Sequence, residues 1–310
     1  ACLPATLAGG GMVQSGSIAA SLHGAFGWPS LAIGLGTAAA AGMILTGGLG
    51  RIARVSQALV PTMALLYLGG GALVLLLRWQ QVPQALSLIF RCALTPQAAL
   101  GGGLGWTAAE ALRHGVARGV FTNEAGLGTS AMAHGAAEVD HPARQGMWGI
   151  FEVFFATLLT CTLTALVILV GGVYQPETVL AHLRQGTLPD WALGVPLTAR
   201  SFSAVLGEAG AWIVWISLLL FAFSSILGWS YYGQQSLRFL TGGDRLLPLY
   251  RAVFLGCVVL GACGNSAGLW QLVDLCNALM AIPNLLALLL LAPQALRLLQ
   301  QWVQQQNAPV

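Results

Sequence analysis

The chain contains 310 residues, of which 56% are hydrophobic and only 7% are charged, and its mean hydropathy is +0.76. Thirteen basic and ten acidic side chains cannot cover the surface of a water-soluble protein of this length, whereas a lipid bilayer needs no such covering. A water-soluble globule is therefore excluded, and the composition predicts an all-α polytopic membrane protein. A nucleic-acid partner is disfavoured, because the net charge is only +3 and no basic run exceeds Arg51 and Arg54.

Stretches of about 20 apolar residues are candidate transmembrane helices. Eight such stretches occur, at residues 3–22, 29–47, 55–77, 114–137, 147–172, 211–235, 248–264 and 270–292. We expect an interfacial segment at 84–113, an external loop region at 173–210 and a cytoplasmic tail at 293–310. All of these segments belong to one transmembrane domain covering 1–310.

The arginines predict how these helices cross the membrane, because Arg concentrates in cytoplasmic loops. Seven arginines fall in alternate connections and the tail: Arg51, Arg54, Arg144, Arg238, Arg245, Arg251 and Arg297. The short loops at 23–28 and 265–269 contain none. This alternation predicts that both the N-terminus and the C-terminus are cytoplasmic.

The fourth predicted span carries an ionisable residue at its middle. Its central run is Gly119-Val120-Phe121-Thr122-Asn123-Glu124-Ala125-Gly126-Leu127-Gly128-Thr129-Ser130. A charge inside a membrane helix costs about 2.5–3.5 kcal/mol on insertion scales, and the Gly-x-Gly spacing weakens the helix further. We therefore predict a broken helix over 114–137, whose freed carbonyls can ligate a cation and whose freed N–H groups can meet an anionic substrate group.

A phosphate-binding glycine loop is the competing interpretation of this run. The sequence contains neither GxGxxG nor GKS or GKT, and no parallel-strand pattern surrounds the run. We therefore set the phosphate loop aside.

Other polar residues inside the predicted spans have a structural as well as a functional interpretation. Glu152 and Asp274 are intramembrane acids, which indicate function by default, and Asp274 shares a helix face with Asn277. One polar cluster is interpreted as a solvated helix end rather than a metal or acid–base site: His134, Glu138, Asp140 and His141. HExxH and CxxC spacings are absent and the six cysteines are scattered, so no enzyme and no metal cofactor are predicted.

The run from Arg118 to Ser130, with Ala133-His134 and His141-Pro142 after it, resembles the signature of the alanine/glycine:cation symporter family. Further segments match in the family's order: Met12-Val13-Gln14, Cys161-Thr162-Leu163-Thr164, Gly228-Trp229-Ser230-Tyr231-Tyr232-Gly233 and Met280-Ala281-Ile282-Pro283-Asn284-Leu285. The matches extend from about Met12 to Leu291 and are specific.

The resemblance implies a leucine-transporter-type fold, with two inverted five-helix repeats and a site near the bilayer midplane. It implies symport of alanine or glycine with Na⁺, or with H⁺, across the bacterial inner membrane, with no other cofactor. Implied substrate-binding residues are Gln14, Phe121, Asn123, Glu124, Ala125, Gly126 and Gly128. Implied cation-binding residues are Thr122, Ser224 and Ser225, with Glu152 and Asp274 as coupling or structural acids and Asn277 and Asn284 as polar helix-packing residues.

The sequence departs from the family pattern in two ways. Eight spans cannot form two five-helix repeats, so we expect the first three helices of the family to be missing. Ala156 stands where the family usually has Asp, and Glu152 lies one α-helical turn earlier on the same face.

A non-transporting remnant or accessory membrane protein of the same family is the alternative function. A channel is less favoured, because no repeated selectivity filter occurs.

Overall fold

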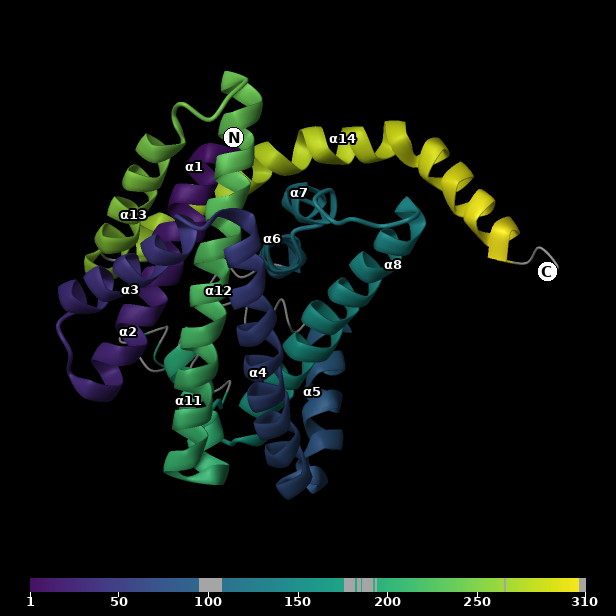
Figure 1. Cartoon of the computed structure of the whole chain (residues 1–310). Helices are drawn as coiled ribbons and strands as arrows, with labels where there is room; N and C mark the ends of the chain where they lie inside the picture. The colour runs from purple at the N-terminus through teal and green to yellow at the C-terminus, as the bar shows by residue number, and fades with distance from the viewer. Residues whose placement is uncertain are drawn as a thin grey trace.

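The computed structural model describes residues 1–94, 108–175, 194–264 and 266–306, together with residues 182, 185 and 192. All regular elements in this part of the chain are helical (Figure 1). The N-terminal elements are α1 (Cys2–Ala5), the π-helix η1 (Thr6–Val13), α2 (Gln14–Phe26), α3 (Ser30–Leu45), α4 (Gly48–Leu77), the 3₁₀-helix η2 (Trp79–Gln81) and α5 (Val82–Leu94).

The remaining elements follow the same pattern of long helices joined by short connections. They are α6 (Ala108–Asn123), α7 (Thr129–His134), α8 (Pro142–Val153), the π-helix η4 (Phe154–Thr160), α9 (Cys161–Val170), α11 (Gly194–Leu206), α12 (Glu208–Thr241), α13 (Leu247–Cys263) and α14 (Ser266–Gln306). Of the loop region expected at 173–210, residues 176–181, 183–184, 186–191 and 193 lie outside the described residues, and the described part includes α11 and the start of α12.

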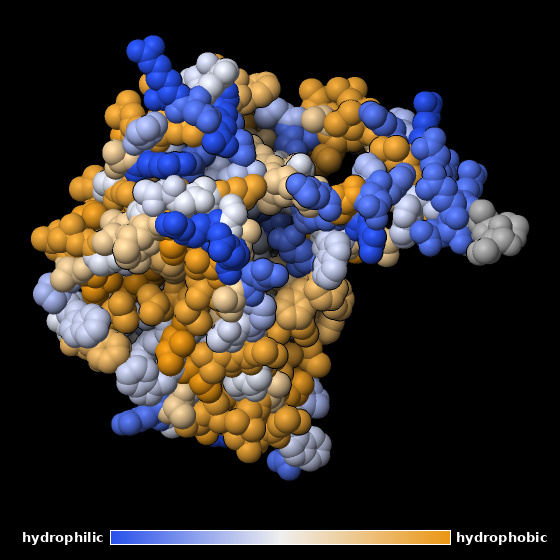
Figure 2. All heavy atoms as spheres, in the orientation of Figure 1, coloured by the Kyte–Doolittle hydropathy of each residue, from blue (hydrophilic) through white to orange (hydrophobic). Residues whose placement is uncertain are grey.

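Four helical stretches of the described chain are long and apolar enough to cross a membrane. They are Gly48–Leu77, Pro142–Val170, Glu208–Thr241 and Gly268–Gln306, and the shorter helices α3 and α13 are also apolar. Many large apolar side chains are exposed, and apolar residues cover much of the face shown in Figure 2. This surface is unfavourable in water and suits a bilayer, so the expected all-α polytopic membrane protein is confirmed for the described residues.

Two π-helices interrupt stretches that the sequence analysis treats as ordinary α-helices. In η1, three consecutive glycines, Gly9 to Gly11, leave the widened turn free of side-chain clashes. The π-helix η4 lies between α8 and α9 within one continuous span. Because π-helical hydrogen bonds close after five residues, α-helical face assignments do not carry through either segment.

Helix α12 lies at the centre of two hydrophobic clusters. The first joins it to α2, α3 and α13, and its fully buried members include Ile18, Leu45, Ile226, Leu227 and Phe254. The second joins it to α4, α9 and α11 and includes Val74, Val167, Phe202 and Val214. Helix α12 is therefore held on several sides, which fixes the direction of the side chains that it presents to the broken helix.

Glycines let the helices approach closely around this centre. A Cβ atom at Gly10 of η1 would collide with the Trp229 side chain of α12, and one at Gly261 of α13 would collide with the Met12 backbone. Small residues at membrane helix contacts allow such close backbone packing. The abundance of glycine in this sequence therefore has a packing cause at these two positions.

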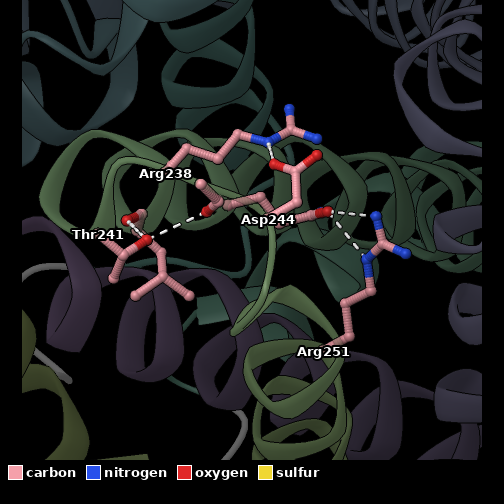
Figure 3. A network of polar contacts seen from close by, with 7 residues as sticks. Arg238, Thr241, Asp244 and Arg251 are labelled. Carbon is pink, nitrogen blue, oxygen red and sulfur yellow. Dashed lines mark hydrogen bonds and ion pairs between the residues drawn. The ribbon is translucent and has the colours of Figure 1, made fainter.

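The connection between α12 and α13 is held by polar contacts (Figure 3). Arg238 donates through Nε to Asp244 Oδ1 at 2.7 Å, and Arg251 donates through Nε and Nη2 to Gln234 Oε1 at 2.9 and 2.7 Å. Helix α12 ends where Gly242 adopts φ 67°, the left-handed conformation typical of a helix C-terminus. These contacts fix the angle between the two helices.

Candidate functional site

The chain loses its helical path between α6 and α7, over Glu124 to Gly128. Glu124 has φ 55° and is the non-glycine residue with positive φ in the described chain, while Gly128 has φ 81°. A side chain in this left-handed region is strained by about 1–3 kcal/mol unless the surroundings hold it there. Such strain is concentrated at functional sites, which makes the break the first candidate for one.

Local hydrogen bonds give the break a defined shape. Asn123 Oδ1 accepts from the Ala125 N–H at 3.1 Å, which is the turn geometry that asparagine favours. The Leu127 N–H donates to the Glu124 carbonyl at 3.0 Å. The sequence thus specifies a turn here, rather than a disordered gap in a helix.

The Glu124 carboxylate is surrounded by polar groups from two other elements. The Thr129 hydroxyl of α7 donates to Glu124 Oε2 at 3.0 Å, and Thr129 is fully buried. Trp229 and Tyr232 of α12 also interact with this carboxylate. Both can do so because residues three apart on a helix lie on the same face. The acid is therefore held by neutral hydrogen-bond donors.

Aromatic side chains form a wall beside the break. The Phe121 ring lies 6.1 Å from the Trp229 ring and 5.9 Å from the Trp270 ring, centroid to centroid, and the second pair meets edge to face. Leu127 of the break packs with Met280 of α14 in a buried cluster that also contains Trp229. The break therefore lies against an apolar surface with its polar groups on one side, which is the usual character of a small-molecule site.

Helix α14 contacts the broken helix at two places. Arg118 of α6 pairs with Asp274 of α14, and the Arg118 guanidinium also lies 4.7 Å from the centroid of the Trp270 ring. Asn284 Nδ2 donates to the carbonyls of Ala125 and Gly126 at 3.0 and 2.9 Å. The segment of α14 between these contacts runs beside the break, in the same chain direction.

The cation-binding residues expected from the resemblance are not joined by hydrogen bonds in the described structure. Thr122 Oγ1 donates to the Arg118 carbonyl at 2.8 Å, and Ser224 Oγ donates to the Phe221 carbonyl at 2.9 Å, both within their own helices. Ser225 lies one turn before Trp229 on α12, on the face that meets Glu124. These hydroxyls keep acceptor lone pairs, so their present bonds do not prevent cation binding.

Gln14 directly follows η1, which meets Phe121 at Gly9, and Asn277 lies on α14, which borders the break. Gln14 is half-buried and begins α2 directly after the π-helix η1. Asn277 of α14 is buried, and neither atom of its amide has a partner among the described residues. Its neighbour one turn earlier, Val273, packs against η1 at Gly9.

Glu152 of α8 contacts the second half of the broken helix. Its carboxylate lies 3.1 Å from His134 Nε2 at the end of α7, and Gln145 lies 2.8 Å from the other ring nitrogen of His134. Ala156 falls inside η4, so the α-helical spacing that places it on the face of Glu152 does not hold from Phe154 onward.

The polar cluster after α7 behaves as a helix end. Asp140 pairs with Arg144 at 3.2 Å, and His141 caps α8 by accepting from the Ala143 N–H at 3.2 Å. In the described ranges, no three His, Cys, Asp or Glu side chains are placed to hold a metal ion. A Gly-x-Ser-x-Gly spacing occurs at 264–268, but it joins the helices α13 and α14, whereas a hydrolase nucleophile needs a strand-to-helix turn.

Sequence reasoning assigned no site role to five residues that contact the break or the residues beside it. They are Arg118, Thr129, Trp229, Tyr232 and Trp270. The sequence held a signal for Arg118 and Trp270. An arginine inside a predicted span needs an acidic partner, and Asp274 is such an acid. Trp270 lies four residues before Asp274 and therefore on the same helix face. The contact of Trp229 and Tyr232 with Glu124 spans more than 100 residues and has no local signal.

Comparisons with known proteins agree with the geometry of a transporter. Residues 1–309 match the model of the sodium:alanine symporter family. The chain is 36% identical over 282 residues to the uncharacterized transporter YflA of Bacillus subtilis, covering 91% of this chain and 57% of the relative. It is 36% identical over 283 residues to the sodium/alanine symporter AgcS of Methanococcus maripaludis, covering 91% of this chain and 59% of the relative.

A third relative is the probable sodium/glutamine symporter GlnT of Bacillus subtilis, which is 34% identical over 296 residues, covering 96% of this chain and 58% of the relative. The chain therefore spans less than two thirds of the length of the curated relatives it matches. The family model covers nearly every residue, and the match includes the run from Arg118 to Ser130 that forms the break. The chain belongs to the sodium:alanine symporter family, whose members are sodium-coupled amino-acid transporters and not enzymes.

Proposed function

We propose that this chain forms the substrate-carrying part of a symporter that moves alanine or glycine into the cell together with Na⁺. The observation that carries the proposal is the turn at Glu124 to Gly128, which breaks a membrane helix beside an aromatic wall. Discontinuous helices of this kind place peptide groups and a charge near the bilayer midplane, where amino acids and coupling ions bind.

The arrangement of the C-terminal helices supports a leucine-transporter-type repeat. From the break onward, the proposed repeat takes five units in order: α6 with α7, α8 through α9, α12, α13 and α14. Of these, α8 through α9, α12 and α14 are long and apolar enough to cross a membrane. The first of the five is the broken one, as expected for the first helix of an inverted five-helix repeat. In this assignment, the fixed site lies where α6, α12 and α14 meet.

The break offers chemistry suited to an amino acid and a small hard cation. The carbonyls of Ala125 and Gly126 do not continue the helix and accept hydrogen bonds from Asn284, and peptide carbonyls are oxygen ligands of the kind that hard cations prefer. The carboxylate of Glu124 can balance the charge of a cation or of the substrate ammonium group. Thr122, Ser224 and Ser225 would add hydroxyl oxygens, and Gln14 an amide.

The size of the substrate follows from the residues around the break. Phe121, Trp229 and Trp270 pack ring against ring on the apolar side, and the space beside Gly126 and Gly128 is filled by Val120 and Asn284. We therefore assign a small side chain to the substrate. A bulky amino acid that the complete transporter accumulates faster than alanine would contradict this assignment.

Transport into proteoliposomes tests the proposed function. The 310-residue chain and the same chain fused behind the N-terminal region of AgcS are each given an inward Na⁺ gradient and labelled alanine. Gradient-driven accumulation that disappears when Na⁺ is replaced by choline supports Na⁺ symport, and accumulation that follows an imposed pH gradient assigns H⁺ instead. If both proteins are folded and neither accumulates alanine or glycine, the symporter proposal is wrong and a non-transporting member of the family takes its place.

A further inference from the structure

We propose that Asn284 is a positioning residue of the transport site, which sets the shape of the break and joins it to a proline-weakened point of α14. This inference rests on the proposed function and deepens it. The carrying observation is the pair of hydrogen bonds from Asn284 Nδ2 to the Ala125 and Gly126 carbonyls, which connect two elements about 160 residues apart in sequence.

Both hydrogens of the Asn284 amide nitrogen are used in this contact. An asparagine amide nitrogen has two hydrogens, and each of the two carbonyls accepts one at 3.0 and 2.9 Å. The amide oxygen faces Gly128, where an added Cβ would lie only 2.8 Å from Asn284 Oδ1. Gly128 therefore serves two needs at once, since it adopts φ 81° and leaves space for the asparagine.

Asn284 lies at a point where α14 bends more easily than elsewhere. Pro283 immediately precedes it and has no N–H, so the α-helical hydrogen bond at that point cannot form. Pro293 lies further along the same helix, and Figure 1 shows α14 arching away from the other helices toward its C-terminal end. A helix that lacks a hydrogen bond bends most easily there, and bending at Pro283 displaces Asn284 first.

A second contact lies on the other side of the proline. Asp274 holds the preceding part of α14 to Arg118 of α6, about 15 Å along the helix from Asn284 at an α-helical rise of 1.5 Å per residue. The segment before Pro283 is thereby tied to α6 and the segment after it to the break. Bending α14 between the two ties changes the spacing of α6 and the break, and with it the site.

The contact also decides which carbonyls meet the coupling ion. While Asn284 donates to the Ala125 and Gly126 carbonyls, these oxygens share their lone pairs with an N–H, which weakens them as cation ligands. Removing the donor leaves two peptide carbonyls without this partner. Asn284 thus biases the ion toward the other oxygens of the site, and its loss changes the affinity for both substrates of a symport cycle.

The substitution Asn284→Asp tests the inference, because it keeps the size of the side chain and removes both donors. In the form of the protein that transports, we expect the KM for alanine to rise about tenfold, as the loss of two hydrogen bonds that shape the site implies. The Na⁺ concentration for half-maximal uptake should fall, because the two freed carbonyls and the new carboxylate attract the cation. Asn284→Gln retains the donors and is expected to recover part of the loss. Gln304→Glu makes the same chemical change at an exposed position of α14 and is the matched control.

Hydrogen exchange provides a readout that does not depend on transport. In nanodiscs, the peptide covering residues 118–130 should exchange several times faster in Asn284→Asp than in the parent or in Gln304→Glu. Unchanged exchange and unchanged KM in a transporting protein would overturn the role of Asn284 and leave the symporter intact. Faster exchange in a protein that does not transport would retain the positioning role and remove the proposed function.

Discussion

Glu124 has a positive φ, a backbone conformation that glycine adopts more easily. This strained conformation lowers the free energy of unfolding of the protein. We predict that Glu124→Gly raises the free energy of unfolding by about 1 kcal/mol, because the strain is relieved. The same change should lower alanine uptake at least tenfold, roughly the effect of losing a charged hydrogen-bond acceptor at a binding site. Unfolding in detergent and uptake into proteoliposomes measure the two effects.

Glu138→Gly is the control for this change, since Glu138 is exposed and has no positive φ. It should leave uptake unchanged and should not stabilise the protein. A Glu124→Gly variant that is less stable than the parent would show that the contacts of the carboxylate with Thr129 and α12 outweigh the strain.

The buried amide of Asn277 has no hydrogen-bond partner within the described residues. An unpaired buried polar group costs about 1–3 kcal/mol, and an apolar group of similar size avoids that cost. We predict that Asn277→Leu raises the free energy of unfolding by an amount in that range. Gln271→Leu, at an exposed position of the same helix, should change it by less than about 0.5 kcal/mol. A less stable Asn277→Leu protein would mean that the amide is paired in the folded protein.

At the scale of helices, the sequence predicts the elements better than it predicts their contacts. The apolar stretches at 55–77, 211–235 and 270–292 lie within α4, α12 and α14, since a run of about 20 apolar residues is a local signal. The boundaries differ, because each of these helices extends beyond the apolar run. The π-helices escape prediction, as the widened turn depends on how neighbouring helices pack.

The candidate site shows the same limit. The turn around Glu124 follows from residues that are adjacent in sequence, an acid beside two glycines. The residues that hold the turn, Trp229 on α12 and Asn284 on α14, are brought to it only by tertiary packing. No pattern within either helix indicates which face meets the break, so their roles had to come from the structure.

The Arg118–Asp274 pair joins α6 to α14, and its strength can be measured between the two helices. Both side chains are about 40% exposed in the isolated chain, which limits the ion pair, while the contact of Arg118 with Trp270 adds a cation–π interaction. We predict a coupling energy of about 0.5–1.5 kcal/mol from a double-mutant cycle of Arg118→Gln and Asp274→Asn. Additive effects on the unfolding free energy would show that the two side chains do not act on each other.

At the scale of the whole molecule, the arginines that the sequence predicts to be cytoplasmic lie in or next to connections on one side of the bundle. The connections α3–α4, α7–α8 and α12–α13 lie in the upper half of Figure 1, and these carry arginines that the sequence assigns to the cytoplasm. The α2–α3 turn, which has no arginine, lies in the lower half. The polar network of Figure 3 would then face the cytoplasm.

Two glycines permit a direct test of this orientation, because a side chain added at Gly24 or at Gly243 meets no neighbouring atom and both residues are exposed. In intact cells, a membrane-impermeant thiol reagent should label Gly24→Cys, near the α2–α3 turn, and should label Gly243→Cys, in the α12–α13 connection, only after permeabilisation. The parent chain gives the background from its own cysteines. The reverse pattern would place the arginine-rich connections outside, against the charge distribution that keeps such loops in the cytoplasm, and would invert the direction in which the site opens.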